Sequence, residues 1–527
     1  MRAWRLTLVA VVAVVAIAVT RIVATYHVFS NTFDEGAHVA AGMEVLERGT
    51  YTFDQEHAPL ARLAMATLPY LAGLRLHGAT NMWDGGFEVL YADGSYSRNL
   101  SLARAGILPF FVLAALVVFV WARQLFDDGV AIVALVLFTT TPAVLAHAGL
   151  ATTDMAVTAG LASALYVWTA APTSSAVTRA LLLGAALGLA ILTKLTSLMF
   201  FPACAAATVV CRWLLVRRGA SDGGPTWTLR ALMIAAVTAG ITIWAGYRFS
   251  FGPPVTRLVG GVPLPAPELV NGLQQIMQHN SSGHDAYLLG EFRRTGWWYF
   301  FPVALAVKTP IALLCLCVAG AVTTVRRAAG GADWRVVVPL VCAVTMLIIV
   351  MPANINIGLR HILPIYPFLA LLGAAGAGAL WRATRTRRVA QTAVTALLLW
   401  QVASSAAAHP DYLPYFNVAA GPHPERVLLD SDLDWGQDLL RLADTVRARR
   451  IPALRIAYFG TADVTRHGMP NVARLGPNER PTGWIAASQR ALSHPAPRYA
   501  VYHWLNAYTP VARAGKSIVL FYIPPRE

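Results

Sequence analysis

Residues 360–381, RHILPIYPFLALLGAAGAGALW, begin with two basic side chains and contain no charged residue after them. An α-helix needs about 20 mainly apolar residues to cross a bilayer, so this segment predicts a transmembrane helix with its basic end at the membrane surface. Similar apolar segments occur along the rest of the chain. They predict about eleven transmembrane helices in all, the others being 4–24, 100–121, 129–147, 152–171, 178–193, 195–216, 229–249, 297–324, 335–352 and 388–408.

The composition supports this class of protein. Hydrophobic residues make up 56% of the 527 residues and charged residues only 13%, whereas a soluble globular chain is about a quarter charged. This excludes a soluble enzyme, a disordered scaffold and a nucleic-acid-binding domain, and it indicates a polytopic membrane protein. The formal net charge is +15, but most arginines lie in short loops, where they are typical of topology signals and of contacts with anionic membrane lipid. The five cysteines all lie in apolar segments, which leaves no disulfide framework and no cysteine-based metal site.

The loop arginines predict the orientation. With a cytoplasmic N-terminus, the inside loops carry Arg123, Arg212, Arg217, Arg218, Arg230, Arg326, Arg327, Arg335, Arg382, Arg385, Arg387 and Arg388. The outside stretches near the helices carry far fewer, as the positive-inside rule requires. An odd number of helices then places residues 25–98, 250–296 and 409–527 outside, in a multi-pass protein of the cell membrane. Arg2 and Arg5 would also fit a signal peptide, but no convincing cleavage site precedes the polar segment that follows.

The chain divides into a transmembrane domain, residues 1–408, and an extracytoplasmic domain, residues 409–527. In the first outer region, residues 35–47 have amphipathic helical spacing and residues 63–74 are apolar but too short to span. Two interfacial helices on the outer leaflet are therefore expected. The tail predicts a small α/β domain. Its predicted helix is 436–449, and its predicted strands are 426–430, 454–459, 483–487, 498–502 and 517–523.

Three carboxylates lie where predicted helices meet the outer surface. Asp34 and Glu35 follow the first apolar segment, and a pair of carboxylates there suits a general base or an electrostatic partner for a developing cation. Acids in the first turn of a helix explain the pair equally well. Asp154 opens the predicted helix 152–171, on the same membrane face. A carboxylate deep in lipid costs about 2.5–3.5 kcal/mol, although a helix cap near the interface is the simpler alternative.

Basic side chains accompany these acids. Lys194 lies at the outer end of the fifth predicted helix, and Arg360 and His361 begin the tenth. Lys308 lies about 11 residues, or about 16 Å, into the eighth, from which its stem could snorkel outward. Each one alone is compatible with a snorkelling anchor. Together, beside acids on the same face, they suit an anionic lipid headgroup such as a phosphate.

Four motifs occur at the outer ends of the predicted helices. Asp34-Glu35 follows the first helix, and Thr152-Thr153-Asp154-Met155 begins the fourth helix. Leu192-Thr193-Lys194 ends the fifth helix, and Arg360-His361-x-Leu363-Pro364-x-Tyr366-Pro367-Phe368 begins the tenth. They resemble the GT-C superfamily of glycosyltransferases, and most closely its lipid-carrier-dependent branch, which includes protein O-mannosyltransferases and lipid A aminoarabinose transferases. Further segments resemble a bacterial subgroup of that branch: Gly283–Gly290, Gly296–Pro302, Lys308–Pro310 and Leu433–Asp438. The similarity covers nearly the whole chain.

The resemblance implies a GT-C-like bundle with two interfacial helices, in which residues 1–408 are catalytic and the sugar donor is a polyprenyl-phosphate sugar. It implies Asp34 as the base, with Glu35 and Asp154 supporting donor or acceptor geometry. The implied substrate-binding residues are His57, Arg62, Lys194, His284, Tyr287, Lys308, Arg360, His361 and Tyr366. No cofactor is required, a divalent cation is compatible, and no residue is assigned to a metal. The tail shows no β-trefoil pattern, which favours a lipid or glycan acceptor over a protein.

Two details depart from simple expectations. His57-Ala58-Pro59-Leu60 has alanine where many relatives have a second proline, which affects the expected local backbone and not the chemistry. In the tail, the acids of Asp430-Ser431-Asp432-Leu433-Asp434 have the spacing of a calcium loop, but Gly436 is one place late and no closing glutamate follows. A structural turn with a helix cap is favoured there, with acceptor binding and a metal site as alternatives.

Two other classes of function remain open. A transporter or flippase for a lipid-linked sugar would show paired halves with broken helices at the bilayer midplane, whereas these charged residues gather on one face. A non-catalytic assembly protein would not need Asp34, Glu35 and Asp154 together.

Overall fold

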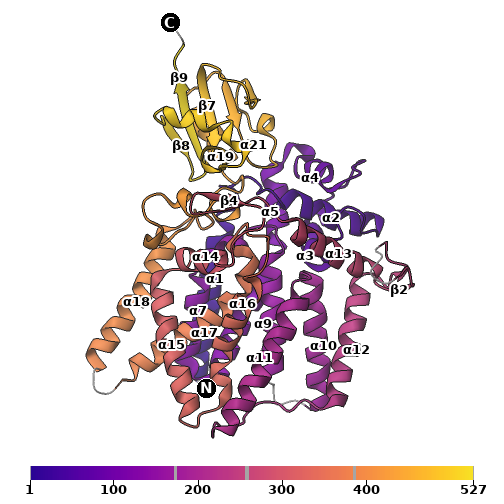
Figure 1. Cartoon of the computed structure of the whole chain (residues 1–527), viewed down its shortest axis with the longest axis vertical. Coiled ribbons are helices and arrows are strands. Elements are labelled where there is room, and N and C mark those ends of the chain that lie inside the picture. The colour runs from indigo at the N-terminus through magenta and orange to yellow at the C-terminus, as the bar shows by residue number, and fades with distance from the viewer. Residues whose placement is uncertain (1, 171–174, 256–259, 384–386, 526–527) are drawn as a thin grey trace.

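The computed structural model describes residues 2–170, 175–255, 260–383 and 387–525. It consists of a bundle of long helices, a layer of short helices and loops over one end of the bundle, and a small β-sheet beyond that layer (Figure 1). We call this end of the bundle the site end. Some residues named in the predictions above lie outside the described residues: Arg385, residue 171 and residues 256–259.

Among the described residues, eight helical segments are long and apolar enough to cross a membrane. They are formed by α1 (Arg2–Val23), α5 (Tyr96–Ala105) with α6 (Leu108–Leu125), α10 (Ala176–Thr193), α11 (Ser197–Arg217), α12 (Leu229–Gly246), α15 (Ile311–Ala329), the turn Leu359–Ile365 with α17 (Tyr366–Trp381), and α18 (Arg387–Ala407). A ninth is the pair α7 (Asp128–Thr139) and α8 (Pro142–Ala148), which is bent by 65°. The predicted helices 152–171 and 335–352 are present as α9 (Asp154–Ala170) and α16 (Val338–Val350), whose 17 and 13 described residues are shorter than those of the eight segments.

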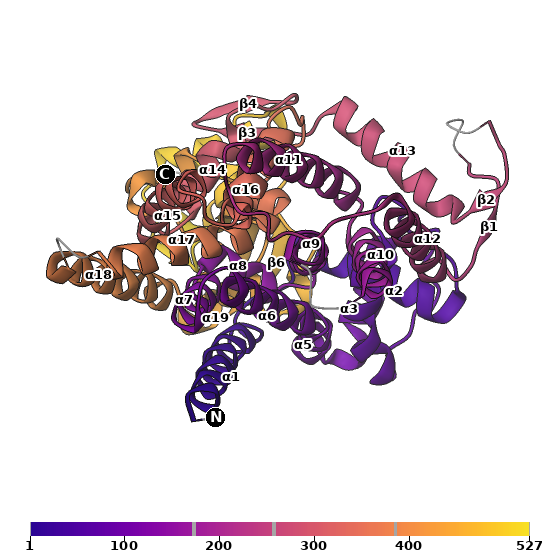
Figure 2. The same ribbon diagram turned by 90° about the horizontal axis from the view of Figure 1, so that it is seen from below.

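The helix α17 is the most buried of these segments, whereas α1 and α18 lie at the edge of the bundle (Figure 2). Close backbone contact explains the glycine-rich sequence of α17. A Cβ at Gly376 would lie 2.3 Å from the carbonyl oxygen of Leu316 on α15, and a Cβ at Gly320 would lie 1.9 Å from that of Leu372. Small residues of this kind allow membrane helices to pack backbone against backbone, where apolar burial provides no driving force.

The predicted single helix 297–324 is wrong in one respect. It is divided at Pro310 into α14 (Phe300–Lys308) and α15, because proline lacks the N–H that would continue the ladder of hydrogen bonds. Lys308 therefore ends a short helix at the site end, and it does not lie inside a long one.

The first polar region contains α2 (Glu35–Arg48), α3 (Pro59–Leu71) and α4 (Met82–Leu90), so the two expected interfacial helices are present as α2 and α3. They cross so closely that a Cβ at Gly42 would lie 2.2 Å from the carbonyl oxygen of Arg62. The second polar region contains β1 (Phe251–Gly252), β2 (Leu264–Pro265), α13 (Pro267–Ser282), β3 (Ala286–Leu288) and β4 (Glu291–Arg293). Both regions lie at the site end (Figure 1).

The tail forms the predicted α/β domain. Its sheet has the strand order β6-β5-β7-β9-β8, in which β5 is parallel to β6 and β7, and β9 is antiparallel to β7 and β8. The elements are α19 (Leu439–Ala448), β5 (Leu454–Ala457), β6 (Val472–Arg474), β7 (Gly483–Ser488), α20 (Gln489–Ser493), α21 (Pro497–Ala500), β8 (Ala512–Ala514) and β9 (Ile518–Ile523). The predicted strands 426–430 and 498–502 are wrong: the first region forms short 3₁₀ turns and the second contains α21.

The opposite end of the bundle gathers arginines. The Arg123 guanidinium lies 4.3 Å from the ring centroid of Trp4, and Arg382 pairs with Asp127 at 2.8 Å. These contacts place the loop arginines after α6 and α17 beside the start of α1, away from the β-sheet (Figure 1).

Candidate functional site

Four charged side chains from distant parts of the sequence meet at the site end. Asp34 precedes α2, Asp154 is the first residue of α9, Lys194 follows α10, and Arg360 lies in the 3₁₀ turn before α17. Arg360 Nη1 donates to Asp34 Oδ2 at 2.9 Å and lies 4.0 Å from Asp154 Oδ2. Lys194 Nζ donates to Asp154 Oδ1 at 2.6 Å. We call these four residues the charged row, because acid and base alternate along it.

Solvent access differs along the charged row. The side chain of Asp154 is fully buried, whereas that of Asp34 is 25% exposed. Asp154 accepts from Lys194 on one oxygen, and its other oxygen has no hydrogen-bond partner in the part of the chain that the structure describes. Asp34 pairs with Arg360 alone among the described ion pairs. Asp34 is therefore the solvent-accessible carboxylate of the row, and Asp154 lies between the two basic groups.

Glu35 is committed to the fold. Its fully buried carboxylate receives two hydrogen bonds from Arg104, at 2.8 and 2.9 Å. It also accepts from the backbone N–H of Thr32 at 2.7 Å and that of Ala151 at 2.8 Å. Glu35 thus joins α2, α5 and the segment before α9, whereas Asp34 has no such set of partners among the described residues. Sequence reasoning missed Arg104, although a charged residue within an apolar segment is a usable signal.

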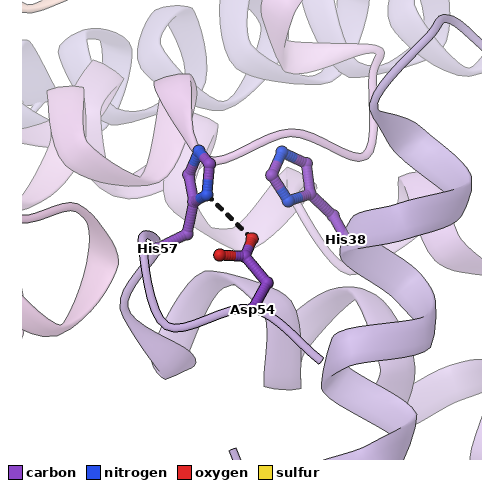
Figure 3. Close-up of side chains that lie close together, drawn as sticks. All are labelled: His38, Asp54 and His57. Atoms are coloured by element: carbon purple, nitrogen blue, oxygen red, sulfur yellow. Dashed lines mark hydrogen bonds and ion pairs between the residues drawn. The ribbon is translucent and has the colours of Figure 1, made fainter. Parts of the chain in front are cut away.

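A second polar cluster lies beside the start of α3 (Figure 3). Arg62 forms an ion pair with Asp54, and His57 Nδ1 lies 2.9 Å from Asp54 Oδ2. The ring of His38 lies 4.9 Å from that of His57. Burial acts to raise the pKa of Asp54, but the charges of Arg62 and His57 outweigh it and lower that pKa. His57 and Arg62 were predicted as site residues. Asp54, which lies in a loop without a motif, and His38 were not.

The tail contacts the charged row directly. The N–H of Phe33 donates to the carbonyl of Trp435 at 3.0 Å, next to Asp34. The N–H of Leu359 donates to Asp432 Oδ1 at 3.1 Å, next to Arg360. The Arg360 guanidinium lies 4.3 Å from the ring centroid of Trp435. The segment 432–435 therefore holds both partners of the Asp34–Arg360 pair, and its acids bond to backbone N–H groups as a structural turn does.

Two comparisons place this architecture among known proteins. Residues 103–244 match the family described as dolichyl-phosphate-mannose-protein mannosyltransferase. Two crystal structures of ArnT from Cupriavidus metallidurans, one bound to undecaprenyl phosphate and one in the apo state, are similar to this chain over 98% of its length and 99% of theirs. Their TM-scores are 0.52 and 0.53, at 14% sequence identity. This chain has the GT-C glycosyltransferase fold.

The resemblance drawn from the four motifs is thereby confirmed at the level of the fold. An archaeal oligosaccharyltransferase, AglB from Archaeoglobus fulgidus, has a TM-score of 0.49 over 98% of this chain and 74% of that one, at 12% identity, which is too low to support an inference. No curated protein matches the sequence of this chain.

Three of the predicted substrate-binding residues form hydrogen bonds with groups outside the charged row. Lys308 Nζ donates to the carbonyl oxygens of Leu413 and Asp432, at 2.7 and 2.5 Å, and so does not snorkel outward. The Tyr366 hydroxyl pairs with that of Thr309 at 3.0 Å. The Tyr287 hydroxyl donates to the carbonyl of Glu425 at 3.0 Å. These side chains fix the tail and the α14–α15 break to the GT-C bundle.

The two remaining histidines face the polar interior of the site end. His361 follows Arg360 and is half-buried, and its buried Nε2 has no hydrogen-bond partner among the described residues. His284 Nδ1 lies 3.3 Å from His279 Nε2, and His279 Nδ1 lies 2.8 Å from Glu56 Oε1. Burial lowers the pKa of His284 to about 4, whereas the hydrogen bond that His279 donates to Glu56 raises the pKa of His279. His279, in the second polar region, thus contacts Glu56 in the first polar region, two residues after Asp54.

Proposed function

We propose that this chain transfers a sugar from a polyprenyl-phosphate donor to a lipid or glycan acceptor, with Asp34 as the base. The observation that carries the proposal is the charged row, in which an accessible carboxylate lies beside two basic groups at one end of a GT-C bundle. The ArnT structure of the same fold binds undecaprenyl phosphate, which supports a lipid phosphate as the ligand.

The chemistry follows from the charges. The acceptor hydroxyl attacks the anomeric carbon and loses its proton to a carboxylate oxygen of Asp34, and the bond from that carbon to the phosphate oxygen breaks. The leaving polyprenyl phosphate carries the negative charge. Lys194 and Arg360 stabilise that charge in a site shielded from water, where such interactions are strongest. In this proposal His57, Arg62, His284 and His361 contact the sugar or phosphate, while Lys308, Tyr287 and Tyr366 stabilise the structure around the site through the hydrogen bonds described above.

The proposed location is the extracytoplasmic face of the cell membrane. Multiple apolar helices make this a multi-pass membrane protein. The arginines at the opposite end of the bundle mark the cytoplasmic side under the positive-inside rule. The charged row and the tail, residues 409–527, then face outward, and residues 1–408 form the catalytic domain.

A donor panel tests the proposal. The purified full chain in lipid nanodiscs is incubated with radiolabelled polyprenyl-phosphate hexoses and pentoses, with and without lipid and glycan acceptors. Transfer of label, or slow hydrolysis of one donor, is the expected result. A transporter or an assembly protein would bind the donor and leave its sugar–phosphate bond intact with every sugar.

Replacing Lys194 by methionine is expected to weaken use of the donor. The substitution removes a charge-assisted hydrogen-bond donor worth about 1.5–3 kcal/mol, so kcat/KM for the donor falls about 10- to 150-fold. Lys194→Arg retains the charge and is expected to recover part of the loss. Steady-state kinetics with varied donor measures this, and equal kcat/KM for Lys194→Met and wild type would remove Lys194 from the phosphate site.

Trp435 is a positioning residue that acts through Arg360. A cation–π contact is worth about 0.5–2 kcal/mol, so Trp435→Ala is expected to lower kcat about 2- to 30-fold. Trp435→Phe keeps an aromatic face and is expected to recover most of that activity. A loss of melting temperature without a change in kcat would instead give Trp435 a purely structural role.

A further inference from the structure

The side chains of His38, Asp54 and His57 converge where α2 faces the loop before α3 (Figure 3). One ligand atom from each lies within 4.8 Å of the other two. Two imidazoles and one carboxylate form a donor set suited to Zn²⁺ and to other divalent first-row transition metals. We propose that His38, Asp54 and His57 bind one such ion.

His38 is the residue that points to a ligand. It is only 4% exposed, and its ring forms no hydrogen bond with any residue that the structure describes. Figure 3 shows this ring beside the Asp54–His57 pair. A metal ion would give a ring nitrogen of His38 a partner beside Asp54 and His57.

The geometry needs only side-chain rotation. Metal–ligand bonds of about 2.1 Å place tetrahedral ligand atoms about 3.4 Å apart, so the three groups must close slightly around the ion. The hydrogen bond of 2.9 Å between His57 and Asp54 would then give way to metal bonds. The side chain of His57 is 28% exposed, which provides a path for the ion.

The surroundings hold the carboxylate in position. Asp54 Oδ1 accepts from the N–H of Glu56 at 2.8 Å, and Arg62 Nη1 donates to the Asp54 carbonyl at 2.7 Å. Such outer contacts orient metal ligands. Arg62 also pairs with the carboxylate itself and neutralises part of its charge. We therefore expect an exchangeable ion, and not a tightly held structural zinc.

The site lies close to the charged row. His38 is one helical turn after Asp34, and its N–H donates to the Asp34 carbonyl at 3.0 Å. An ion there would add positive charge near the proposed base, where it could assist a phosphate; this second role rests on the proposed function. Metal binding itself does not depend on it, so the two proposals can fail separately.

The test measures binding directly. The full chain in nanodiscs is stripped with chelator and titrated with Co²⁺, followed by the visible d–d absorption of the bound ion and by metal analysis after gel filtration. One Co²⁺ per chain is expected, displaced by Zn²⁺. His57→Ala removes a direct ligand and is expected to weaken binding more than about 100-fold, since even outer contacts account for 10- to 100-fold. The exposed His77 lies in the same region, and His77→Ala is the matched control.

Several results would overturn the site. One is the absence of bound Co²⁺ in wild type. Another is an affinity for Co²⁺ that is equal in wild type and in His57→Ala. A loss in His279→Ala with full binding in His57→Ala would place the ion at the Glu56–His279 pair instead. His38→Gln provides a second variant, and gel filtration with thermal melting confirms that each variant folds. Transfer activity that persists in a chain unable to bind metal would remove the ion from the reaction and leave the proposed function intact.

Discussion

Asp34→Asn is expected to lower kcat for sugar transfer at least about 10³-fold. Asparagine has nearly the same shape but cannot accept the proton of the acceptor, and positioned general bases contribute about 10²–10⁴-fold. The expected loss of kcat exceeds the lower end of that range because the charged Asp34 carboxylate also orients Arg360, whose Nη1 lies 2.9 Å from Asp34 Oδ2. Donor binding should change little, since Lys194 and Arg360 remain. Single-turnover transfer with saturating donor measures the effect.

Two controls make this prediction specific. Asp93 is an exposed acid of the same region with a φ of 55°, a conformation that asparagine tolerates well, so Asp93→Asn should retain full activity. Asp34→Asn should also melt close to wild type, because its side chain is partly exposed. Activity of Asp34→Asn within tenfold of wild type would move the base to another carboxylate, and Asp154 would be the first to test.

The second large effect concerns stability. Arg104→Met leaves the Glu35 carboxylate fully buried without its basic partner, and breaking a buried ion pair in this way costs about 3–5 kcal/mol. The variant should therefore unfold at markedly lower denaturant or temperature. Its residual folded fraction should still bind donor, because neither Glu35 nor Arg104 belongs to the charged row.

Arg98→Met is the matched control for Arg104→Met. Arg98 lies on the same helix, α5, but is exposed, so its loss should change the free energy of unfolding by less than about 0.5 kcal/mol. Equilibrium unfolding in mixed detergent micelles compares the two. If Arg104→Met keeps wild-type stability and loses transfer activity, the Glu35–Arg104 pair has a catalytic role.

Much of the fold could be read from the sequence because bilayer-spanning segments carry a strong signal. Helix ends were marked by single ionisable residues such as Lys194, which indeed follows α10. The break at Pro310 was missed because the apolar pattern continues through it, although the proline itself was visible. The short strands β6 and β8 were missed because each has three residues, too few for an alternating pattern.

Site residues could be predicted where a charged side chain lies at a helix end. They could not be predicted where their role depends on contacts between segments that are distant in the sequence. The structure brings together the four charged residues that were predicted from helix ends: Asp34, Asp154, Lys194 and Arg360. The division of labour between Asp34 and Glu35 could not be predicted, because it depends on Arg104, 69 residues away in sequence. The contact of Trp435 with Arg360 depends likewise on how the tail packs, which no local pattern encodes.

The fate of the bond between sugar and phosphate in the donor tests the central claim most directly. Wild type and Asp34→Asn are incubated side by side with the donor selected by the panel, and the free polyprenyl phosphate formed is counted against the sugar transferred. We predict one polyprenyl phosphate for each sugar transferred by wild type, and almost none of either by Asp34→Asn. Donor that is bound by wild type and recovered with every sugar–phosphate bond intact would contradict the account.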